Sequence, residues 1–123
     1  MPDSIAPPAA NYAHAVLSEA MTRWLHTAGV VPTTPDGTVP EVLGEQAAVI
    51  WSNIGAILTA AGMSPGDVVS VTTYVVAGQP LAPVMQARDA FLDGRPVAST
   101  LVTVPALARP EWLVEVSVIA AAP

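Results

Sequence analysis

Apolar residues repeat along the chain with two different periods, one typical of a helix and one typical of a strand. Prolines separate the segments that show these periods. From residue 41 to residue 61 apolar side chains repeat at helical spacing, and Gly62 stands where such a helix would end. The run VVSVTTYVV after Asp67 is rich in β-branched residues and predicts a strand. Its alternation would place on one face Ser70, Thr72 and Tyr74, and on the other Val69, Val71 and Val75.

The remaining elements are predicted from shorter patterns. We expect short strands at residues 12–16 and 23–27, a second helix at residues 81–92, and two final strands. In the first of these strands one side would carry Ser99, Leu101 and Thr103, and in the final strand a shared side would carry Leu113, Glu115, Ser117 and Ile119. The resulting order of two strands, helix, strand, helix and two strands predicts an α+β domain with helices on one sheet face.

Composition sets the size of the domain and its need for a partner. The 123 residues are 52% hydrophobic and only 11% charged, so we expect one domain over residues 1–123 with a sizeable core. A surface with so little charge is expected to be covered in part by another subunit. The sequence therefore predicts an oligomer.

Charge and residue counts exclude several classes of protein. The formal net charge of −6, with no lysine, would repel a phosphate backbone, so we expect no nucleic-acid partner. The chain has no cysteine, and therefore no thiol nucleophile or sulfur-based zinc site. The uncharged stretches 46–66 and 68–87 contain polar residues or prolines, which argues against a membrane span. The first residues do not form a secretory signal, and we expect a cytoplasmic protein.

Four segments of the chain resemble one known family, in that family's order and at nearly its spacing. They are NYAHAV, HTAGVVPTTPDGTVP, EQAAVIWSNIGAILTAAGMSPGDVVSVTTYVV and LVEVSVIA. On these segments the chain resembles the Rid (YjgF) family of small trimeric enamine and imine deaminases. The resemblance implies a chorismate-mutase-like α+β fold, with a mixed sheet and two helices on one face. It also implies a homotrimer with the sheets facing inward and three pockets at the subunit interfaces.

The resemblance assigns roles to three residues that match the family's pocket. Tyr12 stands at the position of the pocket tyrosine, and Gly29 at that of a loop glycine that offers backbone groups. Glu115 stands at the position of the strand glutamate that holds the hydrolytic water. A small-molecule ligand is therefore expected, with no cofactor.

Other pocket positions depart from the family's pattern. Ser99 replaces the signature arginine that grips the substrate carboxylate, Leu101 replaces a small polar residue, and Met85 replaces a common asparagine. A serine hydroxyl cannot replace the guanidinium of arginine, which binds a carboxylate through two charged hydrogen bonds, so substrates that lack a carboxylate are favoured. Arg95 or Arg88 could instead supply the missing cation.

Simpler roles stay open for several of these residues. Glu115 could be an interface carboxylate paired to an arginine or to backbone amides, and Tyr12 could be a packing residue. His14 follows Tyr12 at strand spacing and could line the same pocket as a proton-transfer partner, while His26 precedes Gly29. A third ligand is not apparent, so no metal site is expected.

Three function classes follow from this pattern. The first is a divergent hydrolase that acts on a reactive imine or enamine without a carboxylate. The second is a non-catalytic trimer that binds a small molecule or another protein. The third is an ordinary 2-imino-acid deaminase in which another cation replaces the lost arginine. Turnover of imines with and without a carboxylate would separate them.

Overall fold

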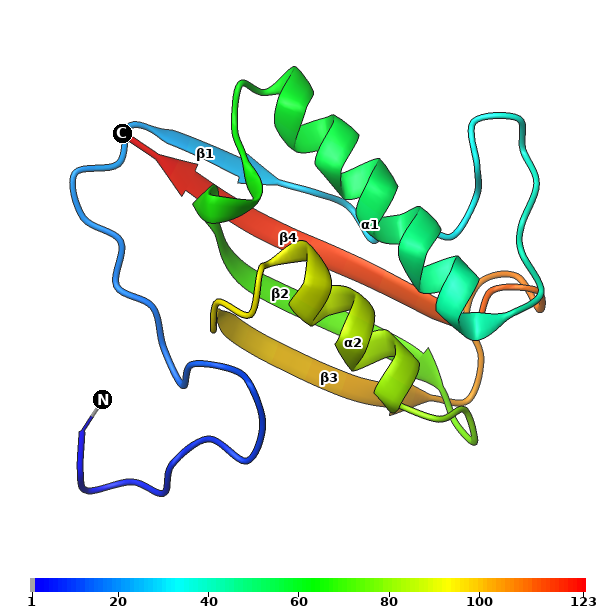
Figure 1. Cartoon of the computed structure of the whole chain (residues 1–123), viewed down its shortest axis with the longest axis horizontal. Helices are drawn as coiled ribbons and strands as arrows, with labels where there is room; N and C mark the ends of the chain where they lie inside the picture. Colours follow the sequence, from blue (N-terminus) through cyan, green and yellow to red (C-terminus); the bar gives the residue numbers. More distant parts are fainter. Residues whose placement is uncertain (1) are drawn as a thin grey trace.

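The computed structural model describes residues 2–123, which form one mixed sheet with two helices on the same face (Figure 1). The elements in chain order are β1 (Arg23–His26), α1 (Leu43–Ala60), the short 3-10 helix η1 (Pro65–Asp67), β2 (Val68–Val76), α2 (Ala82–Phe91), β3 (Ala98–Val104) and β4 (Val114–Ala122). The sheet order is β1-β4-β2-β3, in which β2 and β3 are parallel and the other two pairs are antiparallel. The predicted α+β architecture is confirmed.

Helix α1 lies where the apolar spacing predicts a helix, and its apolar stripe is buried. The buried side chains are Leu43, Gln46, Ala47, Ile50, Trp51, Ile54 and Leu58. Gly62 ends the helix with φ of +68°, a conformation that a residue with a Cβ adopts only under strain. The N–H of Met63 then donates to the carbonyl of Leu58 at 2.8 Å, which closes the helix end in a Schellman motif. No helix in residues 2–123 is both long and apolar enough to cross a bilayer.

Strands β2 and β4 direct valines toward the helices and polar residues toward the opposite face. The buried valines are Val71 and Val75 on β2, and Val114, Val116 and Val118 on β4. The register pairs Tyr74 with Glu115 and Thr72 with Ser117, so these four side chains share the face away from the helices. The pairing is irregular between Val68 and Ser70, and this bulge places Val68 in the core. Simple alternation from Val71 would have put Val68 on the opposite face.

The strand predicted at residues 12–16 is not formed, and this prediction is wrong. Only Ala13 pairs with the sheet, through an isolated parallel bridge to Ala98 in which its N–H donates to the carbonyl of Val97 at 2.8 Å. Residues 14–17 are exposed, so the segment has no apolar face to bury and nothing extends the pairing. The single bridge nevertheless fixes Tyr12 beside the edge strand β3.

The sheet face away from the helices is only partly covered by the described chain. Tyr74, Glu115 and Ile119 are half-buried, and Val102 on β3 is 39% exposed. This face mixes apolar and polar side chains instead of being uniformly charged, which is typical of a surface that another protein covers. The identity of that cover, including the expected homotrimer, stays a prediction at this point.

Candidate functional site

Glu115 and Gly29 lie against each other on the sheet face away from the helices. The segment that contains Gly29 is held by two backbone hydrogen bonds between Val30 and Val116, of 2.7 and 3.1 Å. A methyl group at Gly29 would lie 2.7 Å from Cδ of Glu115, closer than real Cβ contacts allow. An alanine at position 29 would therefore force the Glu115 side chain away from its place beside this loop. The structure brings these two predicted residues together.

Within residues 2–123 the Glu115 carboxylate has no hydrogen-bond or ion-pair partner. It is half-buried on β4, and among residues 2–123 it forms no ion pair with an arginine or histidine. No backbone amide of residues 2–123 donates a hydrogen bond to it either. The simpler interpretation of Glu115 as an edge or interface carboxylate, paired to an arginine or to backbone amides, stays a prediction, and within residues 2–123 the group is free to bind water or a ligand.

A second group of predicted residues lines a cavity of about 320 Å³ between α2, β3 and the N-terminal segment. The lining residues are Ala10, Tyr12, Leu81, Met85, Arg88, Ser99 and Leu101. Met85 and Arg88 are three residues apart on α2 and therefore lie on one side of that helix. Ser99 and Leu101 pair in register with Val71 and Thr73, whose side chains point toward the helices.

The two groups of residues lie on opposite faces of the sheet. Glu115 pairs with Tyr74 on the face away from the helices, whereas Ser99 pairs with Val71 on the helical face. Within one chain, Glu115 and Gly29 therefore do not enter the cavity that holds Tyr12. The sequence-predicted site is thus divided into two halves, one on each face of the sheet.

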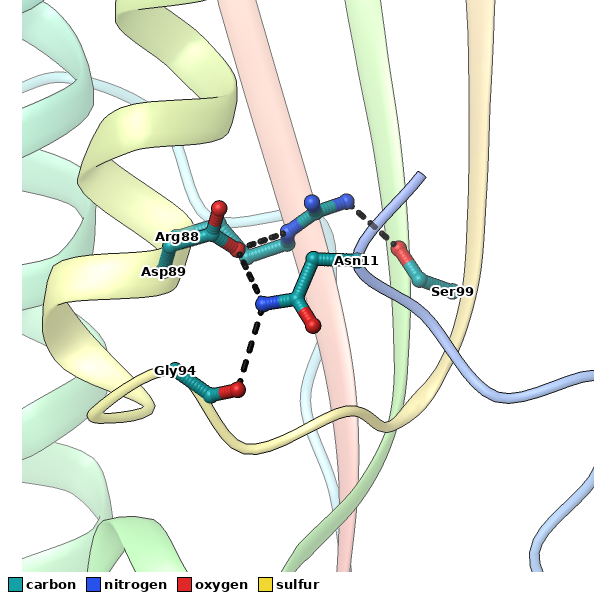
Figure 2. A network of polar contacts seen from close by, with 5 residues as sticks. All are labelled: Asn11, Arg88, Asp89, Gly94 and Ser99. Carbon is teal, nitrogen blue, oxygen red and sulfur yellow. Dashed lines mark hydrogen bonds and ion pairs between the residues drawn. The ribbon is translucent and has the colours of Figure 1, made fainter. Parts of the chain in front are cut away.

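Arg88 is the charged group of the cavity, and its side chain is almost completely buried at 6% exposure. Its Nε donates to Oδ1 of Asp89 at 3.1 Å and its Nη1 donates to Oγ of Ser99 at 3.2 Å, as Figure 2 shows. Its Nη2 is also buried but has no hydrogen-bond partner among residues 2–123. Helix α2 and strand β3 thus meet at this guanidinium, which reaches the position where the resemblance places the family's arginine.

Asn11 ties the N-terminal segment to this network. Its Nδ2 lies 3.2 Å from Oδ1 of Asp89 and 3.2 Å from the carbonyl of Gly94 (Figure 2). Asp89 therefore accepts from two donors, which fixes the carboxylate that in turn orients Arg88. Sequence reasoning considered Arg88 only as a replacement cation and did not include Asn11 or Asp89. The helical spacing from Met85 was the available signal for Arg88.

Arg95, the other cation considered, is engaged elsewhere. Its Nη2 donates to the carbonyls of Pro65 and Val68 at 2.7 and 2.9 Å, at the start of β2. It lines a separate cavity with Phe91 and Leu92. Arg95 therefore acts as a clamp between η1 and the loop before β3, and it does not contact Ser99.

The two histidines lie outside the cavity that contains Tyr12. His14 is exposed, packs edge-on against the Tyr12 ring at 5.7 Å between ring centroids, and places Nε2 at 2.6 Å from the carbonyl of Ala6. It lines a different cavity, formed with the first residues of the described chain. His26 is exposed at the end of β1. In residues 2–123 no three His, Asp or Glu side chains are grouped so that they could hold a metal ion.

Comparison with known proteins gives consistent matches in sequence. The family model described as "Endoribonuclease L-PSP" matches residues 3–122. The Escherichia coli (strain K12) protein named "Putative reactive intermediate deaminase TdcF" is 31% identical over 68 residues, which cover 54% of this chain and 53% of that protein. The chain thus spans about half the length of the curated relatives it matches.

Solved structures match over almost the whole chain. YyfB of Yersinia pestis, a protein of the conserved Rid family, has 32% identity and a TM-score of 0.85, with 98% of this chain and 95% of that chain covered. E. coli TdcF with bound serine has 25% identity and a TM-score of 0.76, with 99% and 93% covered. RidA from the Antarctic bacterium Psychrobacter sp. PAMC 21119 has 25% identity and a TM-score of 0.76, with 99% and 97% covered.

Proposed function

The chain belongs to the Rid (YjgF) family, and from this premise we propose that it hydrolyses a small reactive imine or enamine in pockets between the subunits of a homotrimer. The observation that carries the proposal is the Glu115 carboxylate, which is unpaired and pressed against Gly29 on the partly covered sheet face. The name of TdcF, a reactive intermediate deaminase, supports the same class of substrate.

The division of the site into two halves supports a composite pocket. Glu115 and Gly29 of one subunit would meet the cavity of Tyr12, Met85 and Ser99 of its neighbour. In a closed trimer the same heterologous contact is repeated three times, which gives three equal pockets. The exposed Val102 and half-buried Tyr74 supply apolar surface for that contact.

The residues of this composite pocket fit the hydrolysis of a carbon–nitrogen double bond. The Glu115 carboxylate takes a proton from water as the water oxygen adds to the imine carbon, and it passes this proton to the nitrogen, which gives a carbinolamine. Glu115 then takes the proton of the carbinolamine hydroxyl and passes it to the amine nitrogen as the carbon–nitrogen bond breaks, so the carbonyl forms, ammonia leaves, and Glu115 is again a carboxylate. One water is consumed, and no oxidant or reductant takes part. The Tyr12 hydroxyl and the backbone of Gly29 are the groups proposed to orient substrate and water.

The family description also names an endoribonuclease, an activity that fits this chain poorly. The formal net charge is −6 and lysine is absent, so the surface has little to attract a polyanion. The second candidate is a non-catalytic trimer that binds a small molecule and keeps Glu115 for hydrogen bonding. Only measured turnover separates this binder from the hydrolase.

The test is the rate of ammonia release above spontaneous hydrolysis. Two imines are generated in situ: an α-imino acid made by an amino acid oxidase, and the imine of benzylamine made by an amine oxidase. We expect acceleration of at least one imine, and a loss of about 100-fold or more in Glu115→Gln. The matched control is Glu111→Gln, because Glu111 is exposed on the loop before β4. No acceleration of either imine, or full activity in Glu115→Gln, would contradict the hydrolase.

A further inference from the structure

We propose that Arg88 binds a carboxylate of the ligand, so that the site takes carboxylate-bearing imines or enamines. This inference rests on the proposed function for its reaction, but carboxylate binding itself can be tested separately. The sequence-based expectation of a substrate without a carboxylate rested on the loss of a cation from position 99. Arg88 supplies a guanidinium beside Ser99 from the neighbouring helix.

The buried guanidinium of Arg88 has an incomplete set of hydrogen bonds within residues 2–123. A guanidinium carries five N–H donors, and buried polar groups in native proteins are almost always paired. Asp89 satisfies Nε and Ser99 accepts one bond from Nη1, whereas Nη2 is buried without a partner in residues 2–123. A ligand acceptor at this edge would remove the deficit.

The N–H donors that remain on the Arg88 guanidinium match the shape of a planar anion. Asp89 occupies the Nε side of the guanidinium, which leaves Nη1 and Nη2 for a planar anion with two oxygens. A carboxylate matches this pair in a bidentate arrangement. The Ser99 hydroxyl accepts from Nη1, so its own proton is available as a further donor.

The charge of Arg88 lies among mostly apolar side chains. Leu81, Met85 and Leu101 line the same cavity, and Arg88 is 6% exposed, so the guanidinium is shielded from water. Electrostatic attraction to an anion is stronger in such surroundings than at the surface. The side chain of Asp89 is 36% exposed and is shared with Asn11, so it neutralises the guanidinium from one side only.

The test compares pyruvate with pyruvamide, a neutral ligand of nearly the same size, by ligand-observed NMR titration. We expect wild-type protein to bind pyruvate about tenfold or more tightly than pyruvamide, because hydrogen bonds to charged groups are the stronger ones. Arg88→Met should bind pyruvate as weakly as pyruvamide. The control Arg95→Met should keep the wild-type preference, because Arg95 is bonded only to backbone carbonyls at the start of β2.

The outcomes separate this inference from the proposed function. Equal affinity of wild-type protein for the two ligands, or a preference for pyruvate that persists in Arg88→Met, would overturn the inference. If Arg88→Met does not fold, Arg88→Lys takes its place: it keeps the charge without the planar fork, and a reduced preference for pyruvate is expected. A carboxylate preference without any ammonia release would leave Arg88 as an anion-binding residue and remove the hydrolase. Ammonia release that depends on Glu115, without a preference for pyruvate over pyruvamide, would keep the hydrolase and remove the carboxylate-binding role of Arg88.

Discussion

Arg88 and Glu115 are the two charged groups of the proposed site, and their surroundings differ in a way that follows from their places in the fold. Arg88 is oriented by residues of its own chain, since Asp89 and Ser99 accept from it and Asn11 fixes Asp89. Glu115 has no such partners and lies against the backbone of Gly29 on a partly covered sheet face. One half of the site is therefore preorganised within the subunit, and in the proposed trimer the other half would be completed by a neighbour.

This difference matches two separate proposed roles: Arg88 binds the ligand, and Glu115 takes part in the reaction. A buried arginine held by a carboxylate and a hydroxyl is suited to recognise a fixed group of the ligand. A carboxylate whose oxygens are not used by an ion pair can hydrogen-bond to water and act as a general base. The four substitutions below test this separation, beginning with the one expected to have the largest effect.

Val102→Asp is expected to dissociate the trimer and to abolish activity. Val102 is 39% exposed on β3, on the sheet face that carries Glu115, and a carboxylate buried there without a partner costs about 1–3 kcal/mol or more at each contact. Sedimentation velocity should show monomers with an unchanged circular dichroism spectrum. Val42→Asp is the control, because Val42 is 59% exposed at the N-cap of α1, where Asp is favourable. A trimer in both variants would show that this face is not the interface.

Gly29→Ala is expected to reduce kcat by about 100-fold, since the added methyl group must displace the Glu115 carboxylate, the proposed general base. Affinity for pyruvate should change much less, because Arg88 lies in the other half of the site. The matched control is Gly44→Ala in α1, where the nearest atom to an added methyl is Cβ of Pro83 at an ordinary 3.8 Å. Equal activity in the two alanine variants would contradict a catalytic role for the contact between Gly29 and Glu115.

Ser99→Ala is expected to weaken pyruvate binding by roughly three- to tenfold, with a small change in kcat. The substitution removes the acceptor of Arg88 Nη1, and a hydrogen bond of this kind contributes on the order of 1 kcal/mol. An NMR titration of the variant measures the effect. Ser52→Ala on the exposed side of α1 serves as the control. A larger loss in kcat than in affinity would place Ser99 in the chemistry instead.

Asp36→Asn tests a turn that belongs to neither half of the site, and it should have the smallest effect. Hydrogen bonds from the side chains of Thr34 and Thr38 hold the pKa of Asp36 below its usual value of 3.8. A lowered folded-state pKa contributes stability above the unfolded pKa, and this contribution is lost as pH falls through the folded pKa. The variant should therefore melt at a slightly lower temperature than wild type at pH 7, and the difference should shrink below pH 3.8. Thermal unfolding at both pH values checks this, and kcat should not change.

The long elements could be predicted from sequence because burial on one face imposes a period on their residues. Helix α1 and strands β2 and β4 carry that period over 18, 9 and 9 residues, and all three lie where they were predicted. The segment at residues 12–16 could not be predicted in this way. It is fixed by one bridge at Ala13 and by the Asn11 side chain, and such contacts leave no periodic pattern.

The candidate site was predicted less completely than the fold. Glu115 and Gly29 occupy positions that the family resemblance identifies, and the structure places them in contact. The division between the two sheet faces depends on the register of β3 against β2, which the sequence does not specify. The role proposed for Arg88 depends on a contact between helix α2 and Ser99 on strand β3. The sequence around Arg88 and the sequence around Ser99 do not show that the two residues meet.

The account's central claim is that Arg88 and Glu115 of one pocket come from different subunits, and mixed trimers test it most directly. Glu115→Gln and Arg88→Met chains, each expected to be impaired on an α-imino acid, are unfolded together, refolded at equal concentration, and assayed for release of ammonia from that substrate. Random assembly should make about one pocket in four fully wild type, so about a quarter of wild-type activity should return. If both residues acted within one chain, every pocket would lack one of them. Activity no higher than that of the separate variants would contradict the account.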